Sequence, residues 1–453
     1  MPGDVRPPQL ADELLEPTIT TVRTSWAVAA LALVVCGALA WRHPGLRLVD
    51  FLSFASRPDR IADGQDIVND LYPVGYPVMV GISGAIVGSR LVGAKVLAVL
   101  AAALSAGAVA RWLGPVVGLW LIAQPVWLTY GATEGTDLPS FALCTLALAL
   151  ARRRPAAAGV VLGLAFLTRY TAMAAIPGVL WLAGRRGWVR CLAGLVLATT
   201  PHWLAAVWLG RSPIPDQSFN LAVGAGARMD IWGALARWPQ GLTRAVSPYL
   251  DQGAFLVGAA GLGFAGLRGD RRAIALLSFA ALHLAMVSLA FANPRLLLPT
   301  LLTVALGLPL VLQHNRLART GLAIAAGVWG VVAVGSAWVV DGQEAALHEV
   351  VGIVSTGGGP VLSTDPWVHR LSGDRLEPSI PARELGGDPR ALDGTTLAQG
   401  ARQRGIQQVV LDRARVGRTY PGLSDALRRP EHVEGLTVRA QTDRYVVFAV
   451  DPR

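Results

Sequence analysis

The chain has 453 residues, of which 53% are hydrophobic and only 15% are charged. Soluble domains usually carry about a quarter of charged residues, so this composition excludes an ordinary soluble protein. The formal net charge is +10, but the arginines cluster in short connections between apolar runs, where membrane proteins carry orientation signals, and we therefore expect no nucleic-acid partner.

The cysteines and the histidines give no sign of a cross-linked or metal-bound framework. Cys36, Cys144 and Cys191 all fall inside apolar runs without motif spacing, which argues against a disulfide framework or a zinc site. The seven histidines show no pairing either. Only one of the 40 basic residues, Lys95, is a lysine, which we attribute to a genomic preference for arginine.

The chain begins with a polar tail over residues 1–24, followed by a first apolar run, Ser25–Trp41. Ala38-Leu39-Ala40 resembles a signal-peptidase site, so a cleaved signal peptide is one interpretation. The acidic leader and the many later apolar runs favour the other, a retained first helix preceded by a cytoplasmic tail.

An acid-rich interval follows and forms the first loop, residues 42–89. It holds Asp50, then four further aspartates interleaved with Arg57 and Arg60, and then the sequence Tyr72-Pro-Val-Gly-Tyr-Pro. We interpret the four later aspartates as a solvated face. The apolar, glycine-rich residues 76–88 are predicted to lie along the membrane surface.

The apolar runs predict a polytopic α-helical membrane protein, because a spanning helix needs about 20 apolar residues. We expect about eleven spans within a transmembrane domain of residues 25–340, namely 25–41, 90–110, 113–130, 138–151, 156–167, 172–183, 191–209, 254–267, 273–292, 296–312 and 321–340.

Every second connection between these spans is basic. Together they carry Arg111, Arg152, Arg153, Arg154, Arg185, Arg186, Arg190, Arg268, Arg271, Arg272, Arg316 and Arg319, with Asp270 as the only acid. Such connections are cytoplasmic by the positive-inside rule. The first loop, a second loop at 131–137, the tip at Arg169, a large loop at 210–252 and the turn at Arg295 then face outward.

Residues 341–453 change character, since they hold 15 of the 30 acids of the chain. Short apolar strands at 360–362, 408–411 and 444–450 alternate with helix-like stretches at 345–353 and 397–404. This alternation predicts a small C-terminal α/β domain. With eleven spans and a cytoplasmic N-terminus, the domain is extracytoplasmic.

Five chemically capable residues are predicted to share the outer face: Asp50, Glu134, Asp137, Arg169 and Arg295. Carboxylates there could serve as a general base or hold a divalent cation. Arginines suit a phosphate, because the planar guanidinium binds it through two hydrogen bonds. The set suggests a site at which a lipid phosphate is bound and a nearby hydroxyl or amine is deprotonated.

An ordered set of motifs carries a family resemblance over roughly residues 25–312. The motifs are Asp50-Phe-Leu-Ser-Phe, Tyr72-Pro-Val-Gly-Tyr-Pro, Arg90-Leu, Pro125 ahead of Glu134-Gly-Thr-Asp-Leu-Pro, Gly163-Leu-Ala-Phe-Leu-Thr-Arg-Tyr-Thr, and Pro294-Arg-Leu-Leu-Leu-Pro. This order resembles the GT-C glycosyltransferases, in the branch of the protein O-mannosyltransferases and the lipid A aminoarabinose transferases.

The resemblance implies an inverting transfer of a sugar from a polyprenyl-phosphate donor to a glycan, lipid or protein acceptor on the outer face of a bacterial plasma membrane. It implies that Asp50 is the catalytic base, although the family often has a second acid beside it and this chain has Phe51. It assigns substrate binding to Glu134, Asp137, Arg169, Arg295, Arg90 and Tyr76, and leaves a divalent cation open.

Other interpretations remain. Glu134 and Asp137 would also suit the N-terminus of a helix starting near Leu138, and Arg169 and Arg295 would suit membrane anchoring. A lipid or solute transporter or flippase would place charges within its spans, and no acid falls inside a clear span here. A membrane scaffold presenting the C-terminal domain would not need charges on several separate outer loops.

Overall fold

The computed structural model describes residues 19–43, 51–64, 67, 73–211, 236, 239, 253–290, 294–339, 342–365, 368 and 392–451. The chain divides into two compact units. The larger unit comprises Met1–Trp41 and Arg57–Trp338, and the smaller comprises Arg42–Ser56 and Val339–Arg453.

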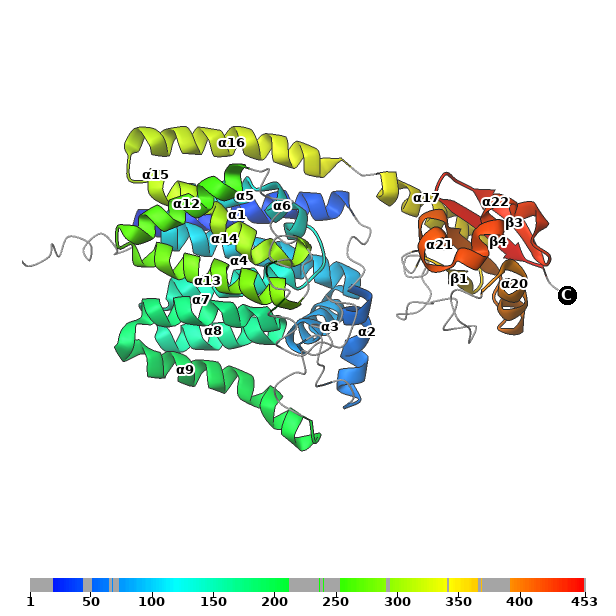
Figure 1. Ribbon diagram of the computed structural model, residues 1–453, viewed down its shortest axis with the longest axis horizontal. Helices are drawn as coiled ribbons and strands as arrows, with labels where there is room; N and C mark the ends of the chain where they lie inside the picture. Colours follow the sequence, from blue (N-terminus) through cyan, green and yellow to red (C-terminus); the bar gives the residue numbers. More distant parts are fainter. Residues whose placement is uncertain are drawn as a thin grey trace, which may run out of the picture. The chain divides into compact units, whose positions relative to one another are not determined.

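The described chain up to Trp338 is helical (Figure 1). Its elements are α1 (Ile19–Arg42), α2 (Phe51–Ala62), α3 (Gly75–Val87), α4 (Arg90–Leu113), α5 (Pro115–Ile122), α6 (Pro125–Gly131), α7 (Asp137–Leu150), α8 (Pro155–Thr168), η3 (Tyr170–Ala175), α9 (Ile176–Trp208), α12 (Gly253–Leu267), α13 (Arg271–Ala290), η4 (Pro294–Leu297), α14 (Leu298–Ala305), α15 (Gly307–Leu312) and α16 (Arg316–Trp338).

Among the described residues, five helical segments are long and apolar enough to cross a membrane: Val22–Arg42, Arg90–Leu113, Tyr170–Trp208, Arg271–Leu289 and Arg316–Trp338. Shorter apolar helices occupy most of the other predicted runs. The polytopic helical character is therefore confirmed. The number of crossings, eleven by our count, stays a prediction.

Proline and glycine interrupt several of the predicted spans. The run over 113–130 forms α5 and α6, which begin at Pro115 and Pro125, because proline lacks the amide hydrogen that would continue a preceding helix. In α9, Gly184 takes a left-handed conformation with φ of +67°. That kink separates the two runs that we counted as 172–183 and 191–209.

Glycines let the helices of the larger unit approach closely. A Cβ atom on Gly159 of α8 would overlap the carbonyl oxygen of Cys191 in α9, and one on Gly194 of α9 would overlap that of Ala156. Between α3 and α4, a Cβ on Gly93 would lie 2.6 Å from the backbone nitrogen of Gly84. Side chains are thus absent where backbones touch, as in other tightly packed membrane helices.

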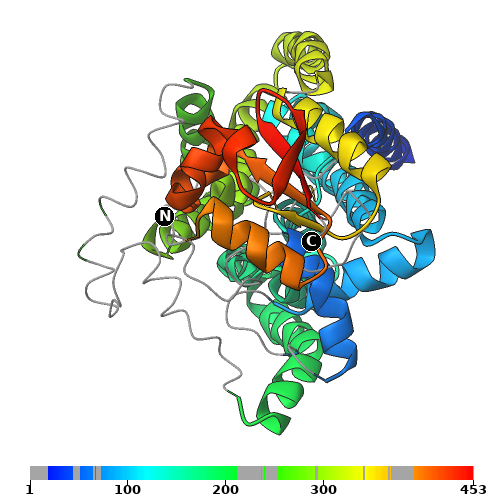
Figure 2. The ribbon, with the colours of Figure 1, turned by 90° about the vertical axis from the view of Figure 1, so that its right-hand side faces the viewer.

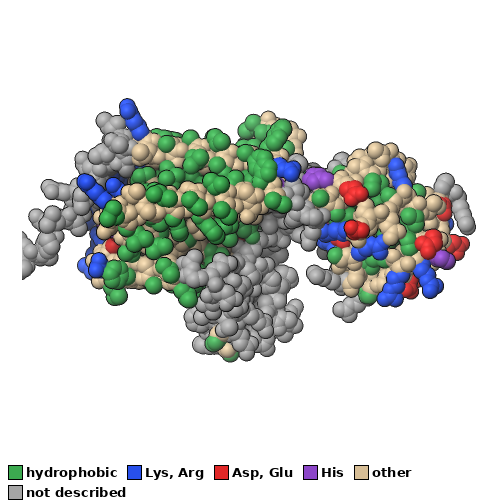
Figure 3. Space-filling view, turned by 90° about the horizontal axis from the view of Figure 1, so that it is seen from above, with side chains coloured by type: hydrophobic (Ala, Val, Ile, Leu, Met, Phe, Trp, Pro, Cys, Tyr) green, Lys and Arg blue, Asp and Glu red, His purple; other side chains and the backbone are tan. Residues whose placement is uncertain are grey.

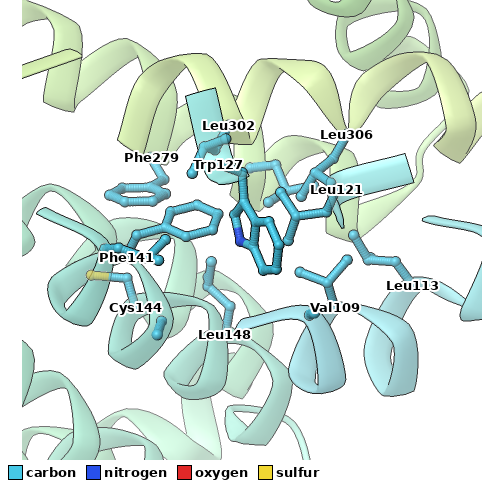
Figure 4. Packing of buried hydrophobic residues seen from close by; sticks show 14 of the residues in the cluster. Val109, Leu113, Leu121, Trp127, Phe141, Cys144, Leu148, Phe279, Leu302 and Leu306 are labelled. Atoms are coloured by element: carbon cyan, nitrogen blue, oxygen red, sulfur yellow. The ribbon is translucent and has the colours of Figure 1, made fainter. Parts of the chain in front are cut away.

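The centre of the larger unit is an apolar core built around Trp127 (Figure 4). Its indole is fully buried, and its Nε1–H donates a hydrogen bond to Ser105 Oγ at 3.1 Å. Leu121, Phe141 and Leu302 surround it from α5, α7 and α14. Because the indole nitrogen has a partner, the tryptophan is buried without an unpaired polar atom.

The outer helices present large apolar side chains outward. Trp41 of α1, Trp208 of α9 and Leu317 of α16 are among the most exposed. Figure 3, seen from the side of α16, shows apolar surface along the larger unit and basic side chains gathered at one of its ends. Such an apolar surface needs an apolar solvent, which fits a membrane-embedded unit.

The smaller unit contains a four-stranded sheet in the order β1-β2-β4-β3 (Figure 2, with β3 and β4 in red). The strands are β1 (Val361–Ser363), β2 (Gln408–Asp412), β3 (Leu436–Gln441) and β4 (Tyr445–Val450). β1 and β2 are parallel, and the other pairs are antiparallel. The helical elements are α17 (Gly342–Gly357), α20 (Gly394–Gln403), α21 (Arg413–Thr419), η5 (Pro421–Leu423), α22 (Ser424–Arg428) and η6 (Pro430–His432).

This unit confirms the predicted C-terminal α/β fold, including three of its strands and the helices now seen as α17 and α20. The prediction missed β3. Its sequence, Leu-Thr-Val-Arg-Ala-Gln, alternates apolar and polar residues, and its side chains alternate in burial accordingly. That period of two is typical of a strand with one solvated face, so the signal was present.

The close approach of α8 and α9 gives a testable prediction. Gly159→Ala should destabilise the protein by about 1–3 kcal/mol, because the new methyl group meets backbone that must move. The measurement is the thermal unfolding midpoint of the purified protein in detergent. Gly327→Ala, in α16, is the matched control, since nothing lies within 4 Å of a Cβ there. Equal midpoints for the two variants would contradict the packing assigned to Gly159.

Candidate functional site

Four of the seven predicted site residues, Tyr76, Glu134, Asp137 and Arg169, gather at the connection between α6 and α7. We call this connection the α6–α7 loop (Ala132–Thr136). The ends of α6 and α8 and the starts of α3 and α7 meet at one end of the larger unit (Figure 1). Within this loop Thr133, Glu134 and Thr136 are buried, as is Asp137, the first residue of α7. Side chains from α3, from α4 and from the residue that follows α8 hold the loop in place.

Tyr76 of α3 holds the middle of the loop. Its side chain is fully buried, and its hydroxyl oxygen accepts a hydrogen bond from the backbone N–H of Gly135 at 2.8 Å. The backbone of Gly135 has a φ of +152°, a conformation that favours glycine. Gly75 lets α3 begin here, because a Cβ on it would lie 2.6 Å from the carbonyl oxygen of Leu167 near the end of α8.

Arg169 holds the end of the loop. It follows α8 in an extended conformation, and its Nη1 lies 2.5 Å from Asp137 Oδ1 and donates a hydrogen bond to Thr136 Oγ1 at 2.9 Å. The Asp137 side chain is 1% exposed and that of Arg169 is 14% exposed. A buried carboxylate next to a guanidinium is electrostatically compensated. Asp137 therefore lies in the first turn of α7 but is held by Arg169.

Lys95 of α4 faces the start of the loop. Its Nζ lies 4.0 Å from Glu134 Oε2, and both side chains are buried. We had attributed this lone lysine to genomic preference. The structure instead places it beside a carboxylate predicted to bind substrate. Two features of the sequence could have identified it. Lys95 is the one lysine among 40 basic residues, and it lies inside an apolar run rather than at the ends of its helix, where Arg90 and Arg111 lie.

Arg90 takes a different partner from the one expected. It forms two hydrogen bonds with the Asp59 carboxylate, one of them at 2.8 Å. The hydrogen bond from Arg90 holds the pKa of the Asp59 carboxyl below its ordinary value. Asp59, which we had assigned to a solvated face, is 57% exposed and yet paired. Arg90 thus lies against α3 and pairs with α2, away from the α6–α7 loop.

Two predicted residues cannot be placed in the same way. Asp50 lies outside the described residues, immediately before α2. Arg295 belongs to η4, but its side chain is outside the described part of the chain. Their roles as base and substrate ligand stay predictions.

A buried histidine was not foreseen. His283 of α13 is 1% exposed, and its Nδ1 lies 2.9 Å from the hydroxyl of Thr300 in α14. The Thr300 hydroxyl in turn donates to the carbonyl oxygen of Ala280. The Thr300 hydroxyl has a single hydrogen, which it donates to Ala280. The hydrogen between Thr300 and His283 therefore belongs to Nδ1 of the histidine ring.

The described residues of the site fit a divalent cation poorly. Within the described ranges, no three His, Cys, Asp or Glu side chains gather in a way that could hold a metal ion. Glu134 and Asp137 each face a basic side chain already, Lys95 and Arg169 respectively. A hard cation prefers several uncompensated oxygen ligands, which this arrangement does not supply.

The smaller unit contains a separate charged cluster where β1 and β2 end. Asp365 and Asp412 are fully buried, and Arg444 reaches both, at 3.8 Å and 3.0 Å. The Tyr445 hydroxyl donates to Asp365 Oδ2 at 2.8 Å, and burial together with that carboxylate raises the pKa of Tyr445. Asp412 also accepts from the N–H of Ala414 at the start of α21. A second cation, Arg415 of α21, lies 3.9 Å from Asp365 and 4.0 Å from Asp412. Two carboxylates thus face two guanidinium groups, and the cluster joins the sheet to α21.

Comparison with solved structures identifies the fold. The chain is similar to ArnT from Cupriavidus metallidurans bound to undecaprenyl phosphate, with 15% sequence identity, a TM-score of 0.59, and coverage of 94% of this chain and 99% of that chain. The apo state of the same enzyme gives 14% identity and a TM-score of 0.57, covering 94% and 98%. No protein-family model matches the sequence, and no curated protein matches it significantly. The predicted GT-C fold is confirmed.

Two arginine–carboxylate pairs of unequal burial give a prediction. Arg169→Ala leaves Asp137 buried without its cation, which typically costs about 3–5 kcal/mol of folding stability. Arg90→Ala breaks a pair whose carboxylate is largely exposed, which typically costs less than about 1 kcal/mol. Thermal unfolding midpoints in detergent should therefore fall much further for Arg169→Ala. A similar fall for both variants would show that the Asp137–Arg169 pair is not buried in the folded protein.

Proposed function

We propose that the chain is an inverting membrane glycosyltransferase that moves a sugar from a polyprenyl-phosphate donor to an acceptor. The fold shared with ArnT over 94% of the chain carries this proposal, because that enzyme was crystallised with undecaprenyl phosphate. The basic and acidic side chains around the α6–α7 loop add support, since a lipid phosphate needs cations at the end of the helical unit. The sugar, a hexose or a pentose, and the acceptor stay open.

In the proposed reaction, the acceptor hydroxyl oxygen attacks the anomeric carbon of the donor sugar, and the Asp50 carboxylate takes the proton from that hydroxyl. The new carbon–oxygen bond forms on the face opposite the breaking bond to phosphate, so the configuration inverts. The bond electrons remain on the departing polyprenyl phosphate. No step requires a metal ion or a cofactor.

Arginine side chains stabilise the charge that grows on the leaving phosphate. Arg169 suits this role because Asp137 and Thr136 hold its guanidinium in one orientation at the end of α8. Arg295 and Arg90 are further phosphate ligands in this proposal. Asp137, Glu134 and Tyr76 shape the binding site by fixing the loop that faces the phosphate.

We further propose that the protein lies in a bacterial plasma membrane with its N-terminus inside. The basic connections between helices then face the cytoplasm, and the α6–α7 loop, the predicted loop at 210–252 and the C-terminal α/β domain face outward. On this arrangement the donor is used on the outer side, and the C-terminal domain is available to a glycan, lipid or protein acceptor.

A transporter or flippase is less well supported. Lys95 and Glu134 are buried charges, which transporters often place near the membrane midplane. Lys95, however, is the sixth residue of the 24-residue helix α4, about 7.5 Å from its first residue at 1.5 Å per residue. The pair therefore lies toward one end of the helix and next to a loop.

The proposal predicts that Asp50→Asn abolishes transfer, with a loss of at least about 100-fold in kcat, the lower range for removal of a general base. Membranes carrying each protein are supplied with a panel of labelled polyprenyl-phosphate sugars, and product and released lipid phosphate are measured. Asp63→Asn is the matched control, because Asp63 is an exposed acid of the same loop.

Equal turnover by the wild type and Asp50→Asn would show that Asp50 is not the catalytic base, while the assignment as a glycosyltransferase would stand. No consumption of any donor by the wild type, accompanied by movement of a lipid or solute across the membrane, would replace the proposed activity with transport.

A further inference from the structure

Lys95 is an unusual residue in this chain. The other 39 of the 40 basic residues are arginines, since the chain contains a single lysine. It lies in α4, within a segment long and apolar enough to span a membrane, and its side chain is only 8% exposed. A buried ammonium group in such a helix is costly unless an anion compensates it.

Glu134 is the anion that faces Lys95. Its side chain has no exposed surface, and its Oε2 lies 4.0 Å from Lys95 Nζ. Three other titratable groups lie close by: the neutral phenol Tyr76 from α3, Asp137 from α7, and Arg169 between α8 and η3. Asp137 has Arg169 as its close cation, at 2.5 Å. Lys95 is the cation that faces Glu134, at 4.0 Å.

An ammonium group suits a buried position beside a single carboxylate better than a guanidinium does. A guanidinium is larger than an ammonium group and carries five N–H donors that all need partners when buried. A compact point charge neutralises Glu134 without those demands.

Glu134 lies one residue before Gly135 and three before Asp137, so its position is coupled to the rest of the site. Tyr76 holds Gly135, and Arg169 holds Thr136 and Asp137. We propose that Lys95 is a positioning residue for the transferase: by neutralising buried Glu134 it holds the α6–α7 loop so that Asp137 keeps Arg169 in place for the phosphate. This inference rests on the proposed function.

The test compares four full-length proteins: wild type, Lys95→Met, Glu134→Gln, and the double variant. Lys95→Met should lower kcat/KM for the polyprenyl-phosphate sugar at neutral pH by about tenfold or more, because it leaves a buried charge uncompensated. The double variant should recover most of that loss, since no charge is left unbalanced. Arg111→Met is the matched control, removing an exposed cation from the last turn of the same helix.

A pH profile separates charge compensation from a purely structural loss. In Lys95→Met, the buried Glu134 carboxylate loses the cation that faces it, and protonation at lower pH removes the buried negative charge. The activity of Lys95→Met relative to the wild type should therefore rise toward low pH. The same ratio for the double variant should stay flat. A pH-independent loss in Lys95→Met, or a double variant as inactive as the single, would overturn the proposal.

The thermal unfolding midpoint in detergent tests the Lys95–Glu134 pair independently of enzyme activity. Each single variant should unfold at a lower temperature than the double variant. If the wild type transfers no sugar but this order holds, the transferase proposal fails while the Lys95–Glu134 pairing stands. If the two single effects simply add in the double variant, the pairing itself is wrong.

Discussion

The structure around the α6–α7 loop depends on one constraint: each buried carboxylate needs a cation beside it. Glu134 and Asp137 lie three residues apart in an apolar helical bundle, and both are almost fully buried. An ionised carboxylate survives there only beside a cation, and Lys95 and Arg169 supply two from different helices. The path of the α6–α7 loop follows from where those two cations lie.

Close backbone packing makes this arrangement possible. Without Cβ atoms at Gly75, Gly84 and Gly93, α3 lies against both α4 and the end of α8. Tyr76 of α3 then reaches the N–H of Gly135, and Lys95 of α4 extends its side chain toward Glu134. The small residues at the helix contacts thus allow the polar and charged side chains near the helix ends to meet.

The smaller unit also buries carboxylates beside cations, but at the ends of β-strands rather than between helices. Asp365 and Asp412 are buried where two parallel strands end, and Arg444 contacts both. Arg444 directly precedes Tyr445, the first residue of β4, so one cation and the hydroxyl come from the same place in the chain. Arg415 of α21 is the second cation near both carboxylates, and the cluster explains how this unit keeps acids in its interior.

The sequence by itself determined the membrane class, the helical runs, the C-terminal α/β domain and the GT-C type of fold, because apolar length, period and motif order are local properties. It also selected Glu134, Asp137 and Arg169. Only the tertiary structure decided that Arg90 binds Asp59 and that Lys95 faces Glu134. Those pairings join residues 31 and 39 positions apart, and the partner of a charged side chain is set by how the helices pack.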